Sequence, residues 1–132
     1  MRVTTGIDII EVNRIKEAIC DMQDSFLNRI YTEEEVKYCK NEKDTQSEMQ
    51  YQHFAACFAT KEAVFKALSQ NITRRGDLPW NEIEVCHTIE GRPKINMDRL
   101  KKLGLNNLLS IDISMSHIKE YAIASAVAIF ND

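Results

Sequence analysis

The sequence predicts an α+β domain in which an antiparallel sheet packs against one long central helix. Residues 54–68 (FAACFATKEAVFKAL) are apolar almost all the way round a helix, and such a helix is expected to be buried. Residues 3–10 alternate with the period of two that marks a strand, and two similar segments close the chain. This order of strand, helices and further strands is typical of an α+β fold. A length of 132 residues fits a single domain spanning residues 1–132.

The first half of the chain is predicted to form one strand and four helices. The strand is expected over residues 3–10 and the helices over 11–20, 25–30, 32–40 and 48–69. The first of these helices is amphipathic and points Arg14 outward. Thr32 followed three residues later by Glu35 is a capping-box pattern, which predicts a helix start at that point. The polar segment 41–50 is expected to be a surface loop or the frayed start of the central helix.

The second half of the chain is predicted to form a loop, four strands and one short helix. The loop is expected over residues 70–78, the strands over 80–88, 92–95, 108–116 and 121–130, and the helix over 98–103. Glu90 and Gly91 favour a turn between the first two of these strands, and Gly104 favours a helix end. The last strand is rich in alanine, which indicates close packing against a helix or a neighbouring subunit.

The composition narrows the possible classes of function. A formal net charge of −3 argues against general nucleic-acid binding, because affinity for a phosphate backbone depends on a basic surface. No apolar run approaches the length of a membrane span and no signal-peptide pattern is present, so we expect a soluble, cytoplasmic protein without a membrane partner. The four cysteines follow no metal-binding or disulfide spacing, which predicts reduced, packed thiols.

Three polar groups stand in apolar surroundings and are the candidates for chemistry. Asp8 interrupts the first strand, and it is either a capping or turn residue or a carboxylate presented to a metal ion. Glu62 and Lys66 lie one turn apart on the central helix, where such a pair either stabilises the helix or serves a site. We expect the Glu62 carboxylate to be buried, which is costly unless a cation or hydrogen bonds satisfy it. The segment 114–117 adds two serines and a histidine near a strand end.

Taken together, these groups indicate a Mg²⁺–phosphate centre. Two carboxylates from a strand and a helix are the usual protein share of a Mg²⁺ site, whose other ligands are water and phosphate oxygens. Lys66 can place a positive charge beside a phosphate, and Ser116 and His117 can donate hydrogen bonds to phosphate oxygens. The sequence has no Walker loop and no GxGxxG pattern, so ordinary nucleotide hydrolysis is not indicated.

Five motifs, in this order, resemble the holo-acyl-carrier-protein synthase family, the small single-repeat 4′-phosphopantetheinyl transferases. They are GIDIIEVNRI, FATKEAVFKAL, WNEIEV, GRP and SMSHIKEYAIASAV, and together they run over nearly the whole chain. The resemblance implies the 4′-phosphopantetheinyl transferase fold and transfer of the 4′-phosphopantetheine arm of coenzyme A to a serine of apo-acyl carrier protein. The reaction releases adenosine 3′,5′-bisphosphate. The resemblance also implies a homotrimer with active sites in clefts between subunits, and a place in fatty-acid and lipid biosynthesis.

The resemblance implies a catalytic set of three residues. Asp8 and Glu62 match the carboxylates that bind Mg²⁺ in the family. Lys66 matches the family lysine near the phosphates. Glu62, directly or through a metal-bound water, is also the candidate general base for the serine proton. No nucleophile on the enzyme is needed, which agrees with cysteines that lack an activating neighbour in the sequence.

The resemblance also implies two sets of binding residues. Ser116 and His117 match a motif that helps to hold coenzyme A, and Gly91 and Pro93 of the GRP turn are assigned to the same substrate. Arg14 matches a basic position on the first helix that faces the acidic carrier protein. The sequence alone does not distinguish a fatty-acid carrier from a polyketide carrier.

The sequence departs from the family pattern beside the catalytic set. Cys57 and Thr60 stand where arginine and alanine are common, and residues 69–71 replace a segment that commonly contains glycine. The missing arginine leaves open a second hypothesis, a non-catalytic module that binds coenzyme A or a carrier protein. A third hypothesis treats Glu62 and Lys66 as an ordinary ion pair in the core. It leaves the joint occurrence of the motifs unexplained.

Overall fold

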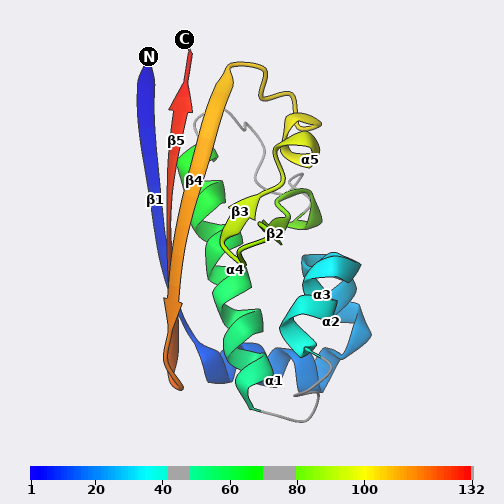
Figure 1. Ribbon diagram of the computed structural model, residues 1–132. Helices are drawn as coiled ribbons and strands as arrows, with labels where there is room; N and C mark the ends of the chain where they lie inside the picture. Colours follow the sequence, from blue (N-terminus) through cyan, green and yellow to red (C-terminus); the bar gives the residue numbers. More distant parts are fainter. Residues whose placement is uncertain (42–47, 70–79, 132) are drawn as a thin grey trace.

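A three-stranded sheet and one long helix form the centre of the computed structural model, which describes residues 1–41, 48–69 and 80–131 (Figure 1). The sheet is antiparallel, with β1 (Arg2–Glu11) and β4 (Leu108–His117) at the edges and β5 (Tyr121–Phe130) between them. Helix α4 (Met49–Leu68) runs along one face of this sheet (Figure 1). The predicted α+β class and the packing of an antiparallel sheet on a long central helix are confirmed.

Smaller elements surround the remaining sides of α4. Three helices lie near its first turns: α1 (Val12–Met22), α2 (Asp24–Ile30) and α3 (Glu33–Lys40) (Figure 1). Farther along lie the 3-10 helix η4 (Trp80–Glu82), strands β2 (Val85–His87) and β3 (Pro93–Ile95), and helix α5 (Met97–Lys101). The β2–β3 hairpin is a separate two-stranded sheet, so the predicted strands are divided between two sheets. None of the described helices has the length and apolar character that a membrane crossing needs.

Small residues allow α4 to lie close to the sheet. Alternate positions of β5 carry four buried alanines, Ala122, Ala124, Ala126 and Ala128. On β1, a Cβ added to Gly6 would overlap the backbone carbonyl oxygen of Ala63. The Thr4 hydroxyl donates a hydrogen bond to the Ala67 carbonyl oxygen at 2.6 Å, which fixes the same strand to the helix. Packing against a helix therefore explains the alanine pattern of the last strand.

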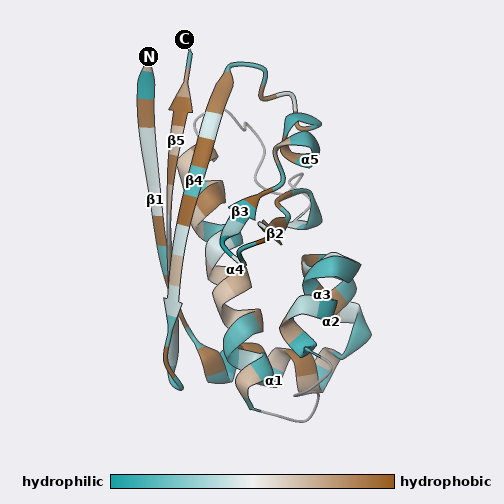
Figure 2. Cartoon of the chain, viewed as in Figure 1, coloured by the Kyte–Doolittle hydropathy of each residue, from teal (hydrophilic) through white to brown (hydrophobic). Residues whose placement is uncertain are grey.

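The opposite face of the main sheet is exposed, and apolar residues recur along its strands β1 and β5 (Figure 2). Its exposed apolar side chains on β1 and β5 are Val3, Ile7, Ile9, Ile123 and Val127. Ile9 lies directly opposite Ile123 in the register, and the neighbouring outward-facing pair on this face is Ile7 and Ser125. Ile7 is 60 % and Ile9 62 % exposed, so the described part of the chain leaves this face uncovered.

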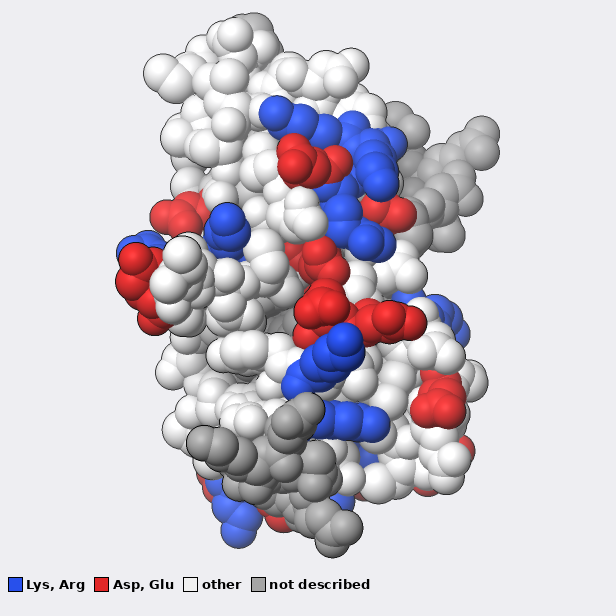
Figure 3. Space-filling view, turned by 45° about the vertical axis from the view of Figure 1, so that its right-hand side comes forward, with Lys and Arg blue, Asp and Glu red and all other residues white. Residues whose placement is uncertain are grey.

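Charges of both signs are mixed on the face that carries α5 and the hairpin. Figure 3 shows basic side chains over α5 and again over α3, with acidic side chains between them. Arg99 and Glu82 approach to 3.8 Å, and Lys37 and Glu34 to 3.7 Å. This face therefore lacks the continuous basic surface that binding to a nucleic-acid backbone requires.

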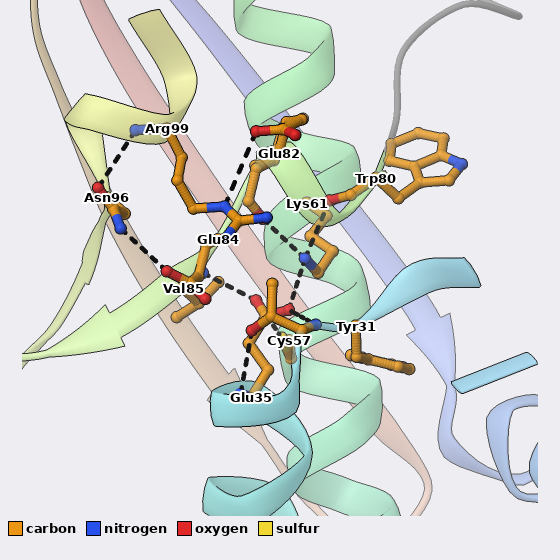
Figure 4. A network of polar contacts seen from close by, with 12 residues as sticks. Tyr31, Glu35, Cys57, Lys61, Trp80, Glu82, Glu84, Val85, Asn96 and Arg99 are labelled. Atoms are coloured by element: carbon orange, nitrogen blue, oxygen red, sulfur yellow. Dashed lines mark hydrogen bonds and ion pairs between the residues drawn. The ribbon is translucent and has the colours of Figure 1, made fainter. Parts of the chain in front are cut away.

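A buried ion pair joins α3, α4 and the hairpin (Figure 4). Lys61 Nζ lies 2.8 Å from Glu35 Oε1, and each side chain is only 1 % exposed. Lys61 Nζ also donates hydrogen bonds to the carbonyl oxygens of Trp80 and Ile83, at 3.0 and 2.7 Å. The second carboxylate oxygen of Glu35 accepts a hydrogen bond from the Val85 backbone N–H at 2.8 Å. Both buried charges are thus satisfied from several elements at once.

This network explains two errors of the sequence prediction. The strand expected over residues 80–88 is shorter, because residues 80–82 form η4 and only Val85–His87 form a strand. A 3-10 turn presents two carbonyls three residues apart to the single ammonium of Lys61, whereas an extended strand would point them to opposite sides. The second error concerns Glu62, which is partly exposed. The buried charge on α4 is its neighbour Lys61.

Several local predictions are confirmed. The capping box is present, because Thr32 Oγ1 accepts from the Glu35 N–H at 3.2 Å and Glu35 Oε1 accepts from the Thr32 N–H at 2.8 Å. Gly91 and Gly104 have φ angles of 87° and 81°, which favour glycine, although α5 ends at Lys101 and not at the predicted residue 103. His117 is the last residue of β4. The loop predicted over 70–78, and residues 42–47 of the loop predicted over 41–50, lie outside the described residues.

We expect Gly6→Ala to lower the free energy of unfolding by about 2 kcal/mol or more, because the added Cβ would force α4 away from the sheet. Urea unfolding followed by circular dichroism measures this loss. Gly91→Ala is the control. A Cβ there has no neighbour within 4 Å, and only the positive φ opposes it, at about 1–2 kcal/mol. A Gly6→Ala loss smaller than that of Gly91→Ala would contradict the close contact.

We expect Lys61→Met to lower the free energy of unfolding by about 3–5 kcal/mol, because it leaves the Glu35 carboxylate buried and unpaired. Adding Glu35→Gln should restore much of the stability, since the amide carries no charge and can still accept from Val85. Lys37→Met is the control, because it breaks an exposed pair with Glu34 and should change stability by less than about 1 kcal/mol. The same unfolding assay applies. No recovery in the double variant would refute this explanation.

Candidate functional site

Asp8 and Lys66 meet where β1 lies against α4. Asp8 shares the face of β1 that carries Gly6, and its side chain is 17 % exposed. Lys66 Nζ donates to Asp8 Oδ1 at 3.2 Å and to the Ile7 carbonyl oxygen at 2.8 Å. The Lys66 side chain is 49 % exposed, so its ammonium remains accessible to a ligand. Asp8 lies in the middle of a strand, which excludes its interpretation as a capping or turn residue.

Glu62 lies with Asp8 on the wall of an open cavity of about 460 Å³. Arg14 of α1 and Arg29 of α2 line the same cavity, and both arginine side chains are exposed. Phe58 contributes an apolar wall and is itself only partly buried. The cavity therefore combines two carboxylates with two guanidinium groups at the surface of the chain.

His117 lines a second cavity, of about 240 Å³, between α3, α4, the hairpin and the end of β4. Pro93 lines the same cavity, whereas Gly91 lies exposed in the hairpin turn. Ser116 precedes His117 in the strand, so it points to the exposed face of the sheet, opposite Ile123. The structure thus places His117 and Pro93 together and places Ser116 and Gly91 apart from them.

Helix α4 separates the two cavities within one chain. Glu62 and Lys66 face β1, whereas His53 lies about 180° away around the helix, on the side of β4. Asp8 and His117 also belong to opposite edge strands, with β5 between them. A single chain therefore does not bring the carboxylates and His117 into one cavity.

Burial controls protonation in the second cavity. Burial lowers the pKa of His87 and of His117, and the nearby His53 lowers the pKa of His117 further. A hydrogen bond with Cys39, together with burial, raises the pKa of the Cys57 thiol well above its usual value. Cys57 is therefore a neutral thiol, and the two imidazoles lose their charge more readily than a free histidine.

Several residues around these cavities were not predicted from the sequence. Arg29 belongs to a different helix from Arg14, so only the folded chain shows that they share a cavity. Gln52 Oε1 accepts a hydrogen bond from His117 Nδ1 over 2.8 Å, across 65 residues of sequence. His53 and Cys57 are one helical turn apart, and that spacing could have marked them as one face of the central helix.

The sequence is similar to known proteins over almost its whole length. Residues 4–126 match the model of the 4′-phosphopantetheinyl transferase superfamily. A holo-[acyl-carrier-protein] synthase from Dehalococcoides mccartyi (strain CBDB1) is 41 % identical over 133 residues, covering 94 % of this chain and 96 % of the relative. The chain belongs to the holo-acyl-carrier-protein synthase family.

Solved structures of this holo-acyl-carrier-protein synthase family share the fold. The protein from Bacillus anthracis, in complex with CoA (3′,5′-ADP), is 32 % identical with a TM-score of 0.71, covering 95 % of this chain and 94 % of that chain. The protein from Helicobacter pylori, in complex with coenzyme A, is 27 % identical with a TM-score of 0.76, covering 95 % and 99 %. The predicted family, fold and transferase class are therefore confirmed.

Proposed function

We propose that this chain transfers the 4′-phosphopantetheine arm of coenzyme A to a serine of apo-acyl carrier protein. The observation that carries the proposal is the cavity shared by Asp8 and Glu62, with the Lys66 ammonium on Asp8, in a member of this family. The serine oxygen attacks the β-phosphate of coenzyme A. The bond from that phosphorus to the bridging oxygen breaks, and adenosine 3′,5′-bisphosphate leaves.

The donor set at this cavity fits a Mg²⁺ ion. Asp8 and Glu62 offer hard carboxylate oxygens, and two such ligands suffice when water and phosphate oxygens complete the coordination. The described residues contain no group of three or more His, Cys, Asp or Glu side chains placed to hold a metal ion, so these two carboxylates are the protein's share of the proposed ligands. When bound there, Mg²⁺ supplies charge neutralisation for the reacting phosphates.

Lys66 and Glu62 supply the charge and the base for transfer. The Lys66 ammonium is half-exposed on a flexible stem, so it can turn from Asp8 to a phosphate oxygen and offset negative charge. Glu62 is the carboxylate proposed to accept the serine proton, and its partly exposed position on the cavity wall leaves it accessible. Catalysis is then mainly positioning and charge neutralisation, as in other phosphoryl transfers.

Arg14 and Arg29 form a basic rim for the carrier protein. Both side chains are exposed on neighbouring helices, and both line the cavity that holds Asp8 and Glu62. An acidic carrier protein would be attracted to this rim, which would direct its serine toward the carboxylates. Electrostatic complementarity of this kind raises the association rate more than the affinity.

A homotrimer accounts for both the divided site and the exposed apolar sheet. Association through the face of β1 and β5 would cover Ile7, Ile9 and Val127, which one chain leaves in contact with water. It would also allow the His117 cavity of one subunit to complete the Asp8–Glu62 cavity of the next. In that arrangement, coenzyme A would span the cleft and contact His117 and Pro93, while contacts to Ser116 and Gly91, which lie outside this cavity, remain expectations from the family resemblance.

The cellular setting is proposed on the same basis. Membership of the holo-acyl-carrier-protein synthase family supports the proposal of a cytoplasmic enzyme that activates the carrier of fatty-acid and lipid biosynthesis. The chain would act as one domain over residues 1–132, most of which the family match covers. A carrier of another pathway is distinguished by testing several carriers in the transfer assay.

We expect purified chain, coenzyme A and Mg²⁺ to increase the mass of apo-acyl carrier protein by one phosphopantetheine arm. Asp8→Ala and Glu62→Ala should each slow this transfer by at least about a hundredfold, because each removes a metal ligand. Mass spectrometry of the carrier over time measures the rate. Asp98→Ala, which removes an exposed carboxylate of α5, should leave the rate unchanged.

The same assay separates transfer from binding alone. Cys57 in place of the common arginine is the observation that favours a non-catalytic coenzyme A binding module. Binding of coenzyme A without any gain of carrier mass, with carriers of several pathways, would support that module and refute the transferase. Full activity of Asp8→Ala and Glu62→Ala would instead refute the metal site.

We expect Val127→Asp to convert a trimer into monomers, because it places a second carboxylate beside Asp112 on the exposed sheet face that forms the proposed interface. Sedimentation equilibrium of both proteins measures the change. Ile89→Asp is the matched control, since Ile89 is fully exposed in the hairpin region and lies off the main sheet. A wild-type chain that sediments as a monomer, or a trimer that survives Val127→Asp, would contradict the proposed interface.

A further inference from the structure

All three histidines of the chain line the cavity of about 240 Å³ between α3, α4, the hairpin and β4. The rings of His53 and His117 meet edge to face, with their centroids 5.4 Å apart. The ring of His87 stacks on Tyr38 at 3.7 Å, with 18° between the ring planes. The cavity therefore has a pair of imidazoles beside a flat aromatic wall.

Hydrogen bonds in this pair leave donors available for a ligand. His117 Nδ1 lies 2.8 Å from Gln52 Oε1, and an amide oxygen only accepts, so the proton sits on Nδ1. His117 Nε2 is then free to gain a second proton. His53 Nδ1 is buried and has no hydrogen-bond partner among the described residues. A buried polar atom without a partner is rare, and here it belongs to a residue that lines a cavity.

Imidazoles are the groups on the lining of this cavity that can take up a positive charge. No lysine or arginine is among the described residues that line it. The other titratable groups that face it are Glu35, Tyr38 and Cys39 from α3, Cys57 from α4 and His87 from β2. The negative charge of Glu35 is neutralised by Lys61, whose Nζ lies 2.8 Å away. A hydrogen bond with Cys39, together with burial, raises the pKa of Cys57, so this thiol is neutral. His87 is already stacked on Tyr38.

We propose that His53 and His117 form a proton-dependent binding site for a phosphate group of coenzyme A, so that affinity for coenzyme A falls as pH rises. This inference rests on the function proposed above, which supplies the ligand. A doubly protonated imidazole donates from both nitrogens, so protonated His117 can keep Gln52 and bind a phosphate oxygen at the same time. His53 Nδ1 gains the partner that it lacks in the free chain.

The direction of the pH effect follows from the free chain. Burial and the neighbouring His53 lower the pKa of His117, so this imidazole is mostly neutral at pH 7 and above when no anion is bound. A phosphate favours the charged form, and binding therefore takes up a proton from solution. Above the pKa of the free imidazole, the dissociation constant rises by up to about tenfold per pH unit. The phosphate itself gains negative charge as pH rises, which acts in the opposite direction and cannot produce this loss.

Calorimetric titration of the full chain with coenzyme A from pH 6 to 8 tests the site, without carrier protein. We expect the dissociation constant to rise with pH, and we expect proton uptake when buffers of different ionisation enthalpy are compared. His53→Gln and His117→Gln should each flatten this dependence. His87→Phe is the control, because a phenyl ring keeps the stack on Tyr38 and should preserve the slope.

Titration with 3′-dephospho-coenzyme A identifies the phosphate. Loss of the slope with this ligand assigns the site to the 3′-phosphate, and retention of the slope assigns it to the pyrophosphate. A wild-type dissociation constant that does not rise with pH, or a slope that His53→Gln and His117→Gln leave unchanged, overturns the inference. Loss of the slope in His87→Phe alone overturns it as well. Proton uptake is measured on the wild-type chain, so it still tests the inference if a variant fails to fold.

The carrier-loading assay at one pH decides the proposed function separately. An active chain whose affinity for coenzyme A does not change with pH overturns only this inference. A chain that binds coenzyme A with the expected slope but loads no carrier overturns only the transferase.

Discussion

The buried ion pair of Glu35 and Lys61 is the constraint on which the rest of the structure depends. Removing two charges from water costs several kcal/mol each, and only well-placed partners recover that cost. The partners come from α3, from the turn at residues 80–83 and from Val85, so these elements hold one arrangement around α4. Because Lys61 is fixed toward them, Glu62 lies about 100° further round the helix, on the side of β1.

The close packing of α4 on the sheet has a consequence for the site. An α-helix with its side chains is about 10 Å across, and neighbouring strands are about 5 Å apart, so α4 covers the inner face of three strands. Polar residues of the edge strands, Asp8 and His117, can reach open space only on opposite sides of the helix. A substrate that contacts both would have to be held by more than one chain, and in the trimer that we propose the uncovered sheet face of β1 and β5 would form the interface.

Local chemistry could be predicted from the sequence, and long-range contacts could not. The capping box of Thr32 and Glu35 depends on four consecutive residues, and the motifs containing Asp8 and Glu62 are short runs. The alternation around Ile83 also looked like a local signal, but the chain there bends to satisfy Lys61, about twenty residues earlier. A helical wheel gives the angle between side chains without showing which sector is covered, so it did not reveal that Glu62 is partly exposed.

Cys57 shows how one substitution can change the way a site obtains its charge. An arginine carries a permanent positive charge, whereas the Cys57 thiol is neutral and donates to Glu35 Oε2 at 3.4 Å. Glu35 needs no further cation, because Lys61 already lies 2.8 Å away. The described residues that line the cavity therefore include the Glu35 carboxylate, which is already paired with Lys61, and no lysine or arginine. On this lining, an imidazole that takes up a proton supplies positive charge beside a bound anion, and under our proposal this links substrate affinity to pH where an arginine would not.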